Sequence, residues 1–214
     1  IWYRLLNCGI RLPASTGTDW FICSNNRVYV QTDDDFSYDA WLDGLRAGRT
    51  FITNGPALFL SADGVAPGAE LASPADGTRT PVTLTWRSFH PLRRVELIHN
   101  GRVVASVKPD ATSARDGAHT VDVPLEHDGW VAARTYGDAR DSFGHAVYAH
   151  TSPVYIGSGV APRAAESAAY FVHALDDAVT WIDRVGKFTN DAQREEVTHL
   201  FHRGREAYTR ILAG

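Results

Sequence analysis

Apolar and polar side chains alternate with a period of two through much of the stretch between residues 57 and 156, as they do in half-buried β-strands. The alternation falls into about seven short runs, as in a β-sandwich: residues 57–61, 81–87, 94–99, 102–107, 119–123, 130–135 and 152–156. Residue pairs that favour turns separate the runs: Asp63-Gly64, Asp76-Gly77, Asn100-Gly101, Asp116-Gly117 and Asp128-Gly129. We therefore expect an immunoglobulin-like β-sandwich over residues 56–157.

The pair Asn100-Gly101 carries the strongest local signal in this region. It joins two alternating runs with only these two residues between them. Both residue types tolerate the positive backbone φ angles of a tight hairpin turn. We expect the runs at 94–99 and 102–107 to pair antiparallel through this turn.

The first residues have a helical period instead. Residues 2–8 place their large apolar side chains on one face, and Gly9 is a natural helix stop. Residues 10–15 are a strand candidate, and a turn of small polar residues follows at 16–19. A helix that leads into a strand ending in a polar turn is half of an α/β repeat.

A second set of such elements follows. Residues 27–32 alternate as a strand, and Ser37 is a good N-cap for a helix that we expect to end at Gly48. Residues 49–54 are another strand candidate, which the Asn-Gly-Pro sequence after it terminates.

The end of the chain is again helical in its pattern. After a Gly-Ser-Gly sequence, a helix begins near Pro162 and carries one apolar face as far as Gly186. A second helix starts near Asn190, which has capping-box spacing with Gln193. We expect residues 160–214 to form a helical hairpin.

The composition of the chain excludes two classes of function, nucleic-acid binding and membrane spanning. Hydrophobic residues make up 44% of the 214 residues and charged residues 21%, as in ordinary folded proteins. The formal net charge of -4 leaves no stripe of Lys and Arg to neutralise phosphates, so we expect no nucleic-acid partner. No apolar run is long enough to span a bilayer and no signal segment opens the chain, so we expect no membrane span.

The cysteines and the first residue bear on the origin of the chain. Cys8 and Cys23 are too few for a disulfide framework and lack zinc-site spacing. They leave the compartment open, with export to the periplasm or out of the cell among the alternatives. The sequence contains no Met, so Ile1 is not a translation start and we expect the chain to be part of a longer protein.

Nine histidines are candidates for metal or acid-base chemistry, which needs several ionisable side chains that converge. His199 and His202 lie three apart on the last predicted helix and could hold a metal together. They lack a third ligand nearby, and two exposed surface histidines are the alternative. His145 and His150 flank a short strand at a spacing that does not point both to the same side.

Two acidic positions remain. The residues at 33–35, all Asp, could hold a hard cation, or could form a solvated loop whose charge favours the dipole of the following helix. Asp19 follows a predicted strand, at the place where barrel and open-sheet enzymes carry catalytic groups. By position alone Asp19 is equally suited to bond its own turn backbone. No phosphate-binding or nucleophile motif occurs, so nucleotide binding and α/β-hydrolase chemistry have no support.

Four strings resemble the C-terminal region of the carbaryl-hydrolase-type metallohydrolases, the CehA/McbA family of the PHP (polymerase and histidinol phosphatase) superfamily. They are WYRLLNCGIRLPASTGTDWF, RVYVQTD, YDAWLDGLRAGRTFITNGP and AHTSPVYI. The sandwich and the closing helices also fit that architecture, so the resemblance extends over nearly the whole chain. It implies a mixed α+β fold: a remnant of a PHP-type (β/α) barrel at 1–55, then the sandwich at 56–157 and the hairpin at 160–214.

The same resemblance implies a function. Members of the family hydrolyse carbamate and phosphate-type esters with water activated on a cluster of divalent metals. The whole protein would then be a metal-dependent hydrolase of a small-molecule ester or phosphoester, with zinc, manganese or iron as cofactor. Asp19, in Gly17-Thr18-Asp19-Trp20-Phe21, matches a metal-ligand position of the superfamily, whereas Phe21 stands where a histidine ligand is common.

Most of that metal site would lie outside this chain. The HxH pair and the further His, Asp and Glu ligands would all precede Ile1, and no HxH occurs in the 214 residues. One carboxylate cannot hold a catalytic ion, because a divalent ion needs about three protein ligands and an open position. We therefore expect this chain alone to be inactive and to hold no metal.

The alternative is a non-catalytic sandwich module that binds carbohydrate or protein. Six aromatic residues could supply a stacking surface or could be core: Trp86, Phe89, Trp130, Tyr136, Phe143 and Tyr148. Residues 1–55 also carry many large apolar side chains, whose exposure to water would be unfavourable. We expect this segment to pack on the sandwich, on the missing N-terminal part of the barrel or on another chain.

Overall fold

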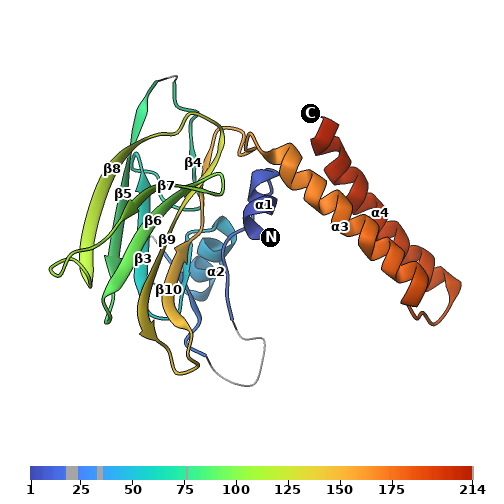
Figure 1. The fold of residues 1–214 in the computed structure, drawn as a ribbon, viewed down its shortest axis with the longest axis horizontal. Helices are drawn as coiled ribbons and strands as arrows, with labels where there is room; N and C mark the ends of the chain where they lie inside the picture. The colour runs from blue at the N-terminus through green and yellow to red at the C-terminus, as the bar shows by residue number, and fades with distance from the viewer. Residues whose placement is uncertain (18–23, 33–35, 76, 214) are drawn as a thin grey trace.

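The computed structural model describes residues 1–17, 24–32, 36–75 and 77–213, and within them the strands form two sheets that pack face to face (Figure 1). The larger sheet has the strand order β1 (Arg27–Val30), β2 (Thr50–Thr53), β10 (Ala146–Thr151), β9 (Gly129–Arg140), β11 (Val154–Ile156) and β4 (Glu70–Leu71). Two more of its strands are β6 (Leu92–His99), which pairs with β9, and β7 (Arg102–Val107), which pairs with β6. The smaller sheet has the order β3 (Ala57–Ala62), β5 (Arg79–Arg87) and β8 (Asp116–Pro124).

The fold is mixed α+β and is dominated by this sandwich-like pair of sheets, as the alternating pattern predicts. The inward-facing side chains of both sheets share one core, in which Leu84 and Trp86 of the smaller sheet meet Leu97 and Val131 of the larger sheet. All four are almost completely buried. Each strand therefore turns one face to the core, which is the physical origin of the period-two pattern.

Two of the predicted turns have opposite outcomes. The hairpin at Asn100-Gly101 is confirmed, since both residues have positive φ angles, 50° and 84°, and His99 pairs with Arg102. The turn expected at Asp116-Gly117 is wrong, because Gly117 lies inside β8. A Cβ atom at Gly117 would stand 2.5 Å from Cζ2 of Trp86, so this glycine makes room for the indole ring instead of forming a turn.

The first helix packs on the outer face of the larger sheet. Helix α1 (Trp2–Asn7) places Leu6 in a buried cluster with Trp130 of β9. The buried side chain of Asn7 accepts a hydrogen bond from Nε1 of Trp130 at 2.8 Å and donates one to Oγ of Ser167 at 3.2 Å. One residue thus joins α1, the sandwich and the third helix, so the expectation that the first residues pack on the sandwich is confirmed for α1.

The strand expected at residues 10–15 does not form. Side chains, instead of a neighbouring strand, bond its backbone: Nε1 of Trp2 donates to the carbonyl of Leu12 at 2.9 Å. The amide of Ala14 likewise donates to Oγ of Ser152 at 2.8 Å. The sequence predicted a strand here because it shows the alternation of apolar residues, but it does not show whether another strand is available for pairing.

The strands β1 and β2 form as expected, but not as a β/α barrel unit. They pair antiparallel, with Tyr29 opposite Phe51, and β2 in turn pairs antiparallel with β10. Units of a β/α barrel have parallel strands. The described residues thus contain no closed barrel, and the larger sheet continues across the boundary predicted at residues 55 and 56.

Helix α2 (Tyr38–Ala47) connects these two strands and has the predicted ends. Oγ of Ser37 accepts a hydrogen bond from the amide of Ala40 at 3.1 Å, which is an N-cap. Gly48 ends the helix in the left-handed conformation, at φ 77°.

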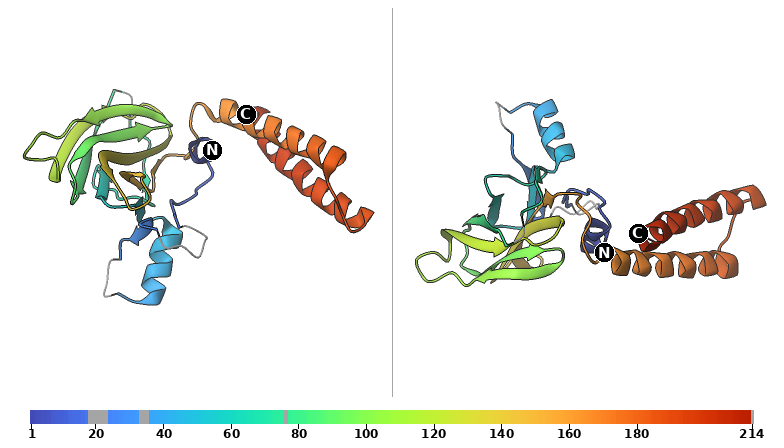
Figure 2. Two further views of the ribbon diagram at one scale, coloured as in Figure 1. Left: turned by 60° about the horizontal axis from the view of Figure 1, so that its bottom comes forward. Right: turned by 90° about the horizontal axis from the view of Figure 1, so that it is seen from above.

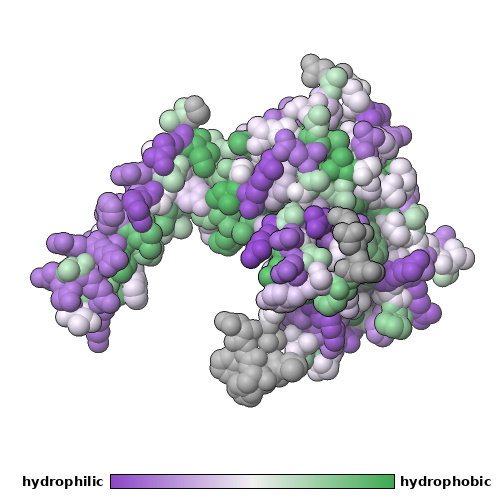
Figure 3. Space-filling view, turned by 180° about the vertical axis from the view of Figure 1, so that it is seen from behind, coloured by the Kyte–Doolittle hydropathy of each residue, from purple (hydrophilic) through white to green (hydrophobic). Residues whose placement is uncertain are grey.

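The predicted helical hairpin consists of α3 (Ala164–Val185) and α4 (Asp191–Ala213), and it projects from the sandwich (Figure 2). The two helices pack against each other, with the rings of Phe171 and Tyr208 stacked at 4.7 Å. Apolar side chains also remain at the hairpin surface (Figure 3). Trp181 and Leu200, which are exposed, belong to the hairpin. In the part of the chain that the structure describes, no helix is long and apolar enough to cross a membrane.

Candidate functional site

The predicted metal ligand lies outside the described residues. Asp19 falls in the interval 18–23, together with Phe21, and the acidic run falls in 33–35. The prediction that Asp19 holds a metal therefore stays a prediction. Of the described residues, no group of three or more His, Cys, Asp and Glu lies close enough together to hold an ion.

The candidate histidines lie apart from one another. His199 and His202 are exposed on α4, as the alternative to a metal pair predicts. His145 is exposed in the turn between β9 and β10, and its Nδ1 lies 3.5 Å from the carboxylate of Asp141. His150 lies on β10 and contacts α1.

The clearest concave surface lies where the larger sheet extends beyond the smaller one. Strand β3 packs over β2, β9 and β10, whereas β1 continues the larger sheet past it. Two adjoining cavities form there, of about 470 and 370 Å³, and both are lined by Tyr29 and Gly55. We call this surface the Gly55 groove.

One end of the Gly55 groove is aromatic. The ring of Tyr29 stacks on that of Phe51, with centroids 5.0 Å apart and planes 11° apart. Phe59 of β3 meets Phe51 edge to face at 5.5 Å. Tyr29 and Phe59 remain 49% and 46% exposed. Tyr29 is exposed because no strand of the smaller sheet covers β1, and Phe59 lies on the face of β3 opposite the buried Leu58 and Leu60. Partly exposed aromatic rings in a concave surface are typical of binding sites.

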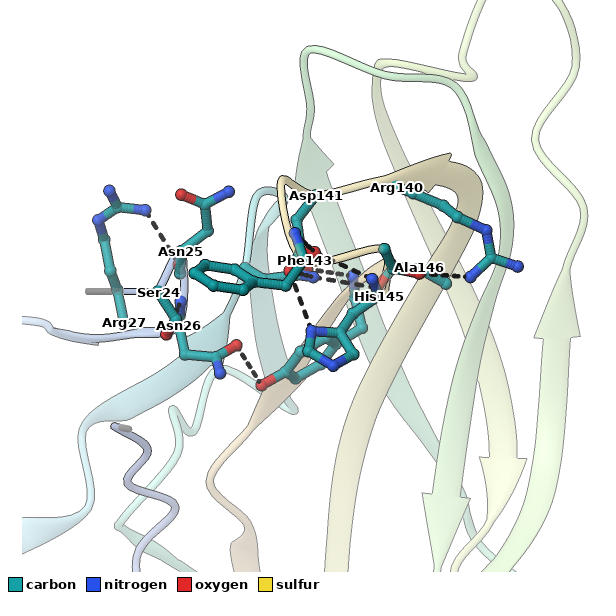
Figure 4. Close-up of polar contacts among 12 residues, drawn as sticks. Ser24, Asn25, Asn26, Arg27, Arg140, Asp141, Phe143, His145 and Ala146 are labelled. Carbon is teal, nitrogen blue, oxygen red and sulfur yellow. Dashed lines mark hydrogen bonds and ion pairs between the residues drawn. The ribbon is translucent and has the colours of Figure 1, made fainter. Parts of the chain in front are cut away.

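The other end of the groove is polar and is built around Asn54. Nδ2 of Asn54 donates to the carboxylate of Asp141 at 3.1 Å and to the carbonyl of Ala146 at 3.0 Å. Its Oδ1 accepts from the amide of Tyr148 at 2.7 Å. The hydroxyl of Tyr148 donates to Asn26 at 3.3 Å, so residues from three distant parts of the chain meet here (Figure 4).

Asp141 braces this end and is not placed for acid-base chemistry. Burial alone would raise its pKa, but hydrogen bonds from Asn54 and from the amides of His145 and Phe143 outweigh burial and hold the pKa below its usual value. Its side chain is only 2% exposed. The carboxylate therefore stays charged, and it accepts hydrogen bonds from Asn54 and from the amides of its own turn. Arg27 and Arg140 lie on opposite sides of this turn (Figure 4).

A second polar cluster holds α1 on the sheet. Nδ1 of His150 donates to the carbonyl of Thr151 at 2.7 Å, so its Nε2 accepts from the hydroxyl of Tyr3 at 2.5 Å. Beside them, Nε of Arg134 donates to the buried carboxylate of Glu96 at 2.7 Å. Burial and, to a smaller extent, the charge of Arg134 lower the pKa of His150 to about 4, while burial raises the pKa of Tyr3. His150 is therefore neutral near pH 7 and serves as a hydrogen-bond acceptor.

The aromatic row suggested by the sequence is divided between core and surface. Trp86 and Trp130 are buried, and Tyr136 and Tyr148 are half-buried. Phe89 and Phe143 are exposed. The exposed rings of the groove, Tyr29 and Phe59, were not singled out from the sequence. The stagger between the two sheets leaves Tyr29 exposed, whereas Phe59 alternates with the buried Leu58 and Leu60 and so faces away from the core.

Comparison with known proteins adds little. No protein-family model and no curated protein matches the sequence. Among solved structures, the chain is similar to a lytic polysaccharide monooxygenase of Jonesia denitrificans, with 12% sequence identity and a TM-score of 0.27. That similarity covers 72% of this chain and 92% of the other chain. At this TM-score the similarity carries no inference about this protein.

Proposed function

We propose that this chain is the C-terminal part of a metal-dependent hydrolase of the CehA/McbA type, in which an immunoglobulin-like sandwich, with the antiparallel strands β1 and β2, lies beside a PHP-type barrel formed by the rest of the protein. The substrate class is a small-molecule ester, carbamate or phosphoester. Asp19 is the residue of this chain that we assign to the metal, which is zinc, manganese or iron.

The observation that carries this proposal is the spatial grouping of the four strings that resemble the family. They contain α1, β1, α2 and β2, which follow one another within residues 2–53, and the end of β10 with β11, at residues 149–156. In space β2 pairs with both β1 and β10, and α1 reaches β10 through the bond between Tyr3 and His150. Oγ1 of Thr50 and Oγ of Ser152 also meet at 2.6 Å. Segments that resemble one family and form one unit support a shared function.

Exposed apolar side chains beside this unit support a further protein partner. Phe36 and Tyr38, at the start of α2, are 80% and 70% exposed. Burying a large apolar side chain contributes about 1.5 to 3 kcal/mol, so leaving both in water is unfavourable. We assign the missing barrel portion as the partner that covers them, with another chain as the alternative.

The described residues by themselves do not fit a metal centre. Asp141 and His145 are a pair without a third ligand, and Asp141 is already saturated by hydrogen bonds. We therefore derive no chemical step through a metal from them, and the remaining ligands belong, in this proposal, to the rest of the protein.

The test uses the full-length protein and the variant Asp19→Ala. Metal content is measured by mass spectrometry and activity with aryl-ester and aryl-phosphate substrates. We expect Asp19→Ala to lose at least one metal equivalent and most of the activity. The matched control is Asp138→Ala, which removes a carboxylate that is 81% exposed and should change neither. Unchanged metal content in Asp19→Ala, or a metal-loaded wild type without hydrolysis, contradicts the proposal.

A binding module is the second candidate function, and the Gly55 groove is the observation that favours it. The groove presents aromatic rings to solvent without help from any residue outside the described chain. Binding by the groove does not exclude the hydrolase, because the groove does not use Asp19, although Arg27, Tyr29 and Arg49 belong to the strings that resemble the family.

A further inference from the structure

The Gly55 groove has the form of an open trough. A third cavity of about 300 Å³, lined by Arg87, Ser88 and Phe89, adjoins the first two at Gly55. The combined surface runs past the end of β3 and is bordered by the exposed ring of Phe89. Three adjoining cavities suit a chain-like ligand, whose units can occupy them in turn, better than a compact one.

The groove is unbalanced in charge. Arg27, Arg49 and Arg140 line its cavities, whereas Asp141 is the one acidic side chain of the described residues that does so. That carboxylate is buried and saturated by its own hydrogen bonds. Neither Arg27 nor Arg49 forms an ion pair with a described carboxylate. Of the described residues, the groove lining thus carries more positive than negative side chains, and this favours an anionic ligand over a neutral or cationic one.

The register of β1 and β2 sets the order of these groups along the groove. Arg27 pairs with Thr53, Tyr29 pairs with Phe51, and the amide of Gln31 bonds the carbonyl of Arg49 at 2.8 Å. The two guanidinium groups thus originate four positions apart along the strand, a span of about 13 Å at about 3.3 Å per residue. The aromatic stack lies between them. A matching ligand carries negative charges at intervals and presents apolar ring faces between the charges.

We propose that the Gly55 groove binds an acidic oligosaccharide, with sugar rings against Tyr29 and Phe59 and carboxylates near Arg27 and Arg49. This inference rests on the second candidate function and is independent of the metal-dependent hydrolase. Sugar rings have apolar C–H faces that pack on aromatic rings, and their carboxylates accept hydrogen bonds from guanidinium groups. An acidic oligosaccharide therefore matches both features of the groove.

The test measures binding of the full chain to an oligogalacturonate and to a neutral cello-oligosaccharide of the same length, by calorimetry. We expect the acidic ligand to bind, to bind more weakly as ionic strength rises, and to bind at least about tenfold more tightly than the neutral ligand. Tyr29→Ala and Arg49→Gln should each weaken binding by about tenfold. The proposal would be overturned if neither oligosaccharide binds or if both bind with equal affinity.

Matched controls come from outside the groove. Trp181→Ala of α3 and Arg46→Gln of α2 remove an exposed ring and an exposed guanidinium group, and should leave the affinity unchanged. Circular dichroism of each variant checks that the fold is intact. A polyglutamate peptide that displaces the oligogalacturonate with equal affinity would overturn the assignment of a sugar. Asp19→Ala should bind as the wild type does, which separates failure of this inference from failure of the hydrolase.

Discussion

The sandwich and the helical hairpin both follow their expected hydrophobic patterns, yet they bury their apolar side chains to very different extents. Leu58, Leu84 and Trp86 of the sandwich are at most 1% exposed. In the hairpin, no residue of α4 is buried, and Trp181 and Leu200 are 63% and 57% exposed. The same class of residue thus meets two different environments in one chain.

The difference teaches that periodicity orients side chains but does not by itself bury them. Each sheet of the sandwich covers the inner face of the other sheet, so alternate residues are sealed from water. Two helices cover only the stripe along which they touch, and the remaining apolar residues need a further layer. The overhang of β1 is the same effect within the sandwich, since a strand without an opposing sheet leaves Tyr29 exposed.

The largest expected effect tests this comparison with one chemical change made in both regions. Leu84→Ala should destabilise the protein by about 3 kcal/mol or more, because the side chain is fully buried and leaves a cavity. Leu175→Ala, in the half-buried seam of the hairpin, should lose about 1 kcal/mol. Urea unfolding measures both. Equal losses would contradict the comparison and would show that the hairpin seam is covered in solution.

The next effect concerns the cluster that attaches α1 to the sandwich. The pKa of His150 is about 4 in the folded protein and 6.5 when unperturbed, so between these values the unfolded chain binds more protons. The stability that depends on neutral His150 is fully present above about pH 6.5 and is lost as the pH falls towards 4, with a total of about 3 kcal/mol.

Unfolding measured across this pH range checks the prediction. His150→Gln should remove much of the slope, while His145→Gln, at a side chain that is 68% exposed, should retain it. An unchanged slope in His150→Gln would show that other groups cause it. The titratable and charged groups beside His150 are Tyr3, Arg134 and Glu96.

The smallest effect extends the comparison to α2, which, like the hairpin, has little tertiary cover. Ser37→Ala removes the oxygen that accepts from the amide of Ala40 and should cost about 1 kcal/mol of stability. Ser37→Asp keeps an acceptor and should stay close to the wild type. The helical circular dichroism signal during thermal unfolding reports both, and identical behaviour of the two variants would rule out the cap.

Local features were predictable because neighbouring residues determine them. The turn at Asn100-Gly101 and the helix end at Gly48 depend on positive φ angles that few residue types adopt, and the cap at Ser37 depends on a side-chain oxygen that accepts from the amide of Ala40. The strands of the sandwich were predictable for a related reason, since the alternation of apolar and polar residues along each strand shows which face is buried.

Pairing partners were not predictable in the same way. Residues 10–15 have the pattern of a strand but bond to side chains, and Gly117 has the context of a turn but accommodates the ring of Trp86. Both outcomes depend on residues distant in the chain. The metal role of Asp19 stays a prediction from the sequence, because the residue lies outside the described ones.

The sequence by itself determined the helices and most of the strands, with the apolar face of each, although the strand expected at residues 10–15 does not form and β4 was not expected. Only the tertiary structure decided that β1 and β2 pair antiparallel, that the larger sheet extends beyond the smaller, and that Tyr29, Phe59 and Arg49 share a groove. The physical reason is the distance along the chain over which each effect acts. Backbone preferences and periodicity act over a few residues, whereas exposure depends on whether another layer of the molecule covers a given face.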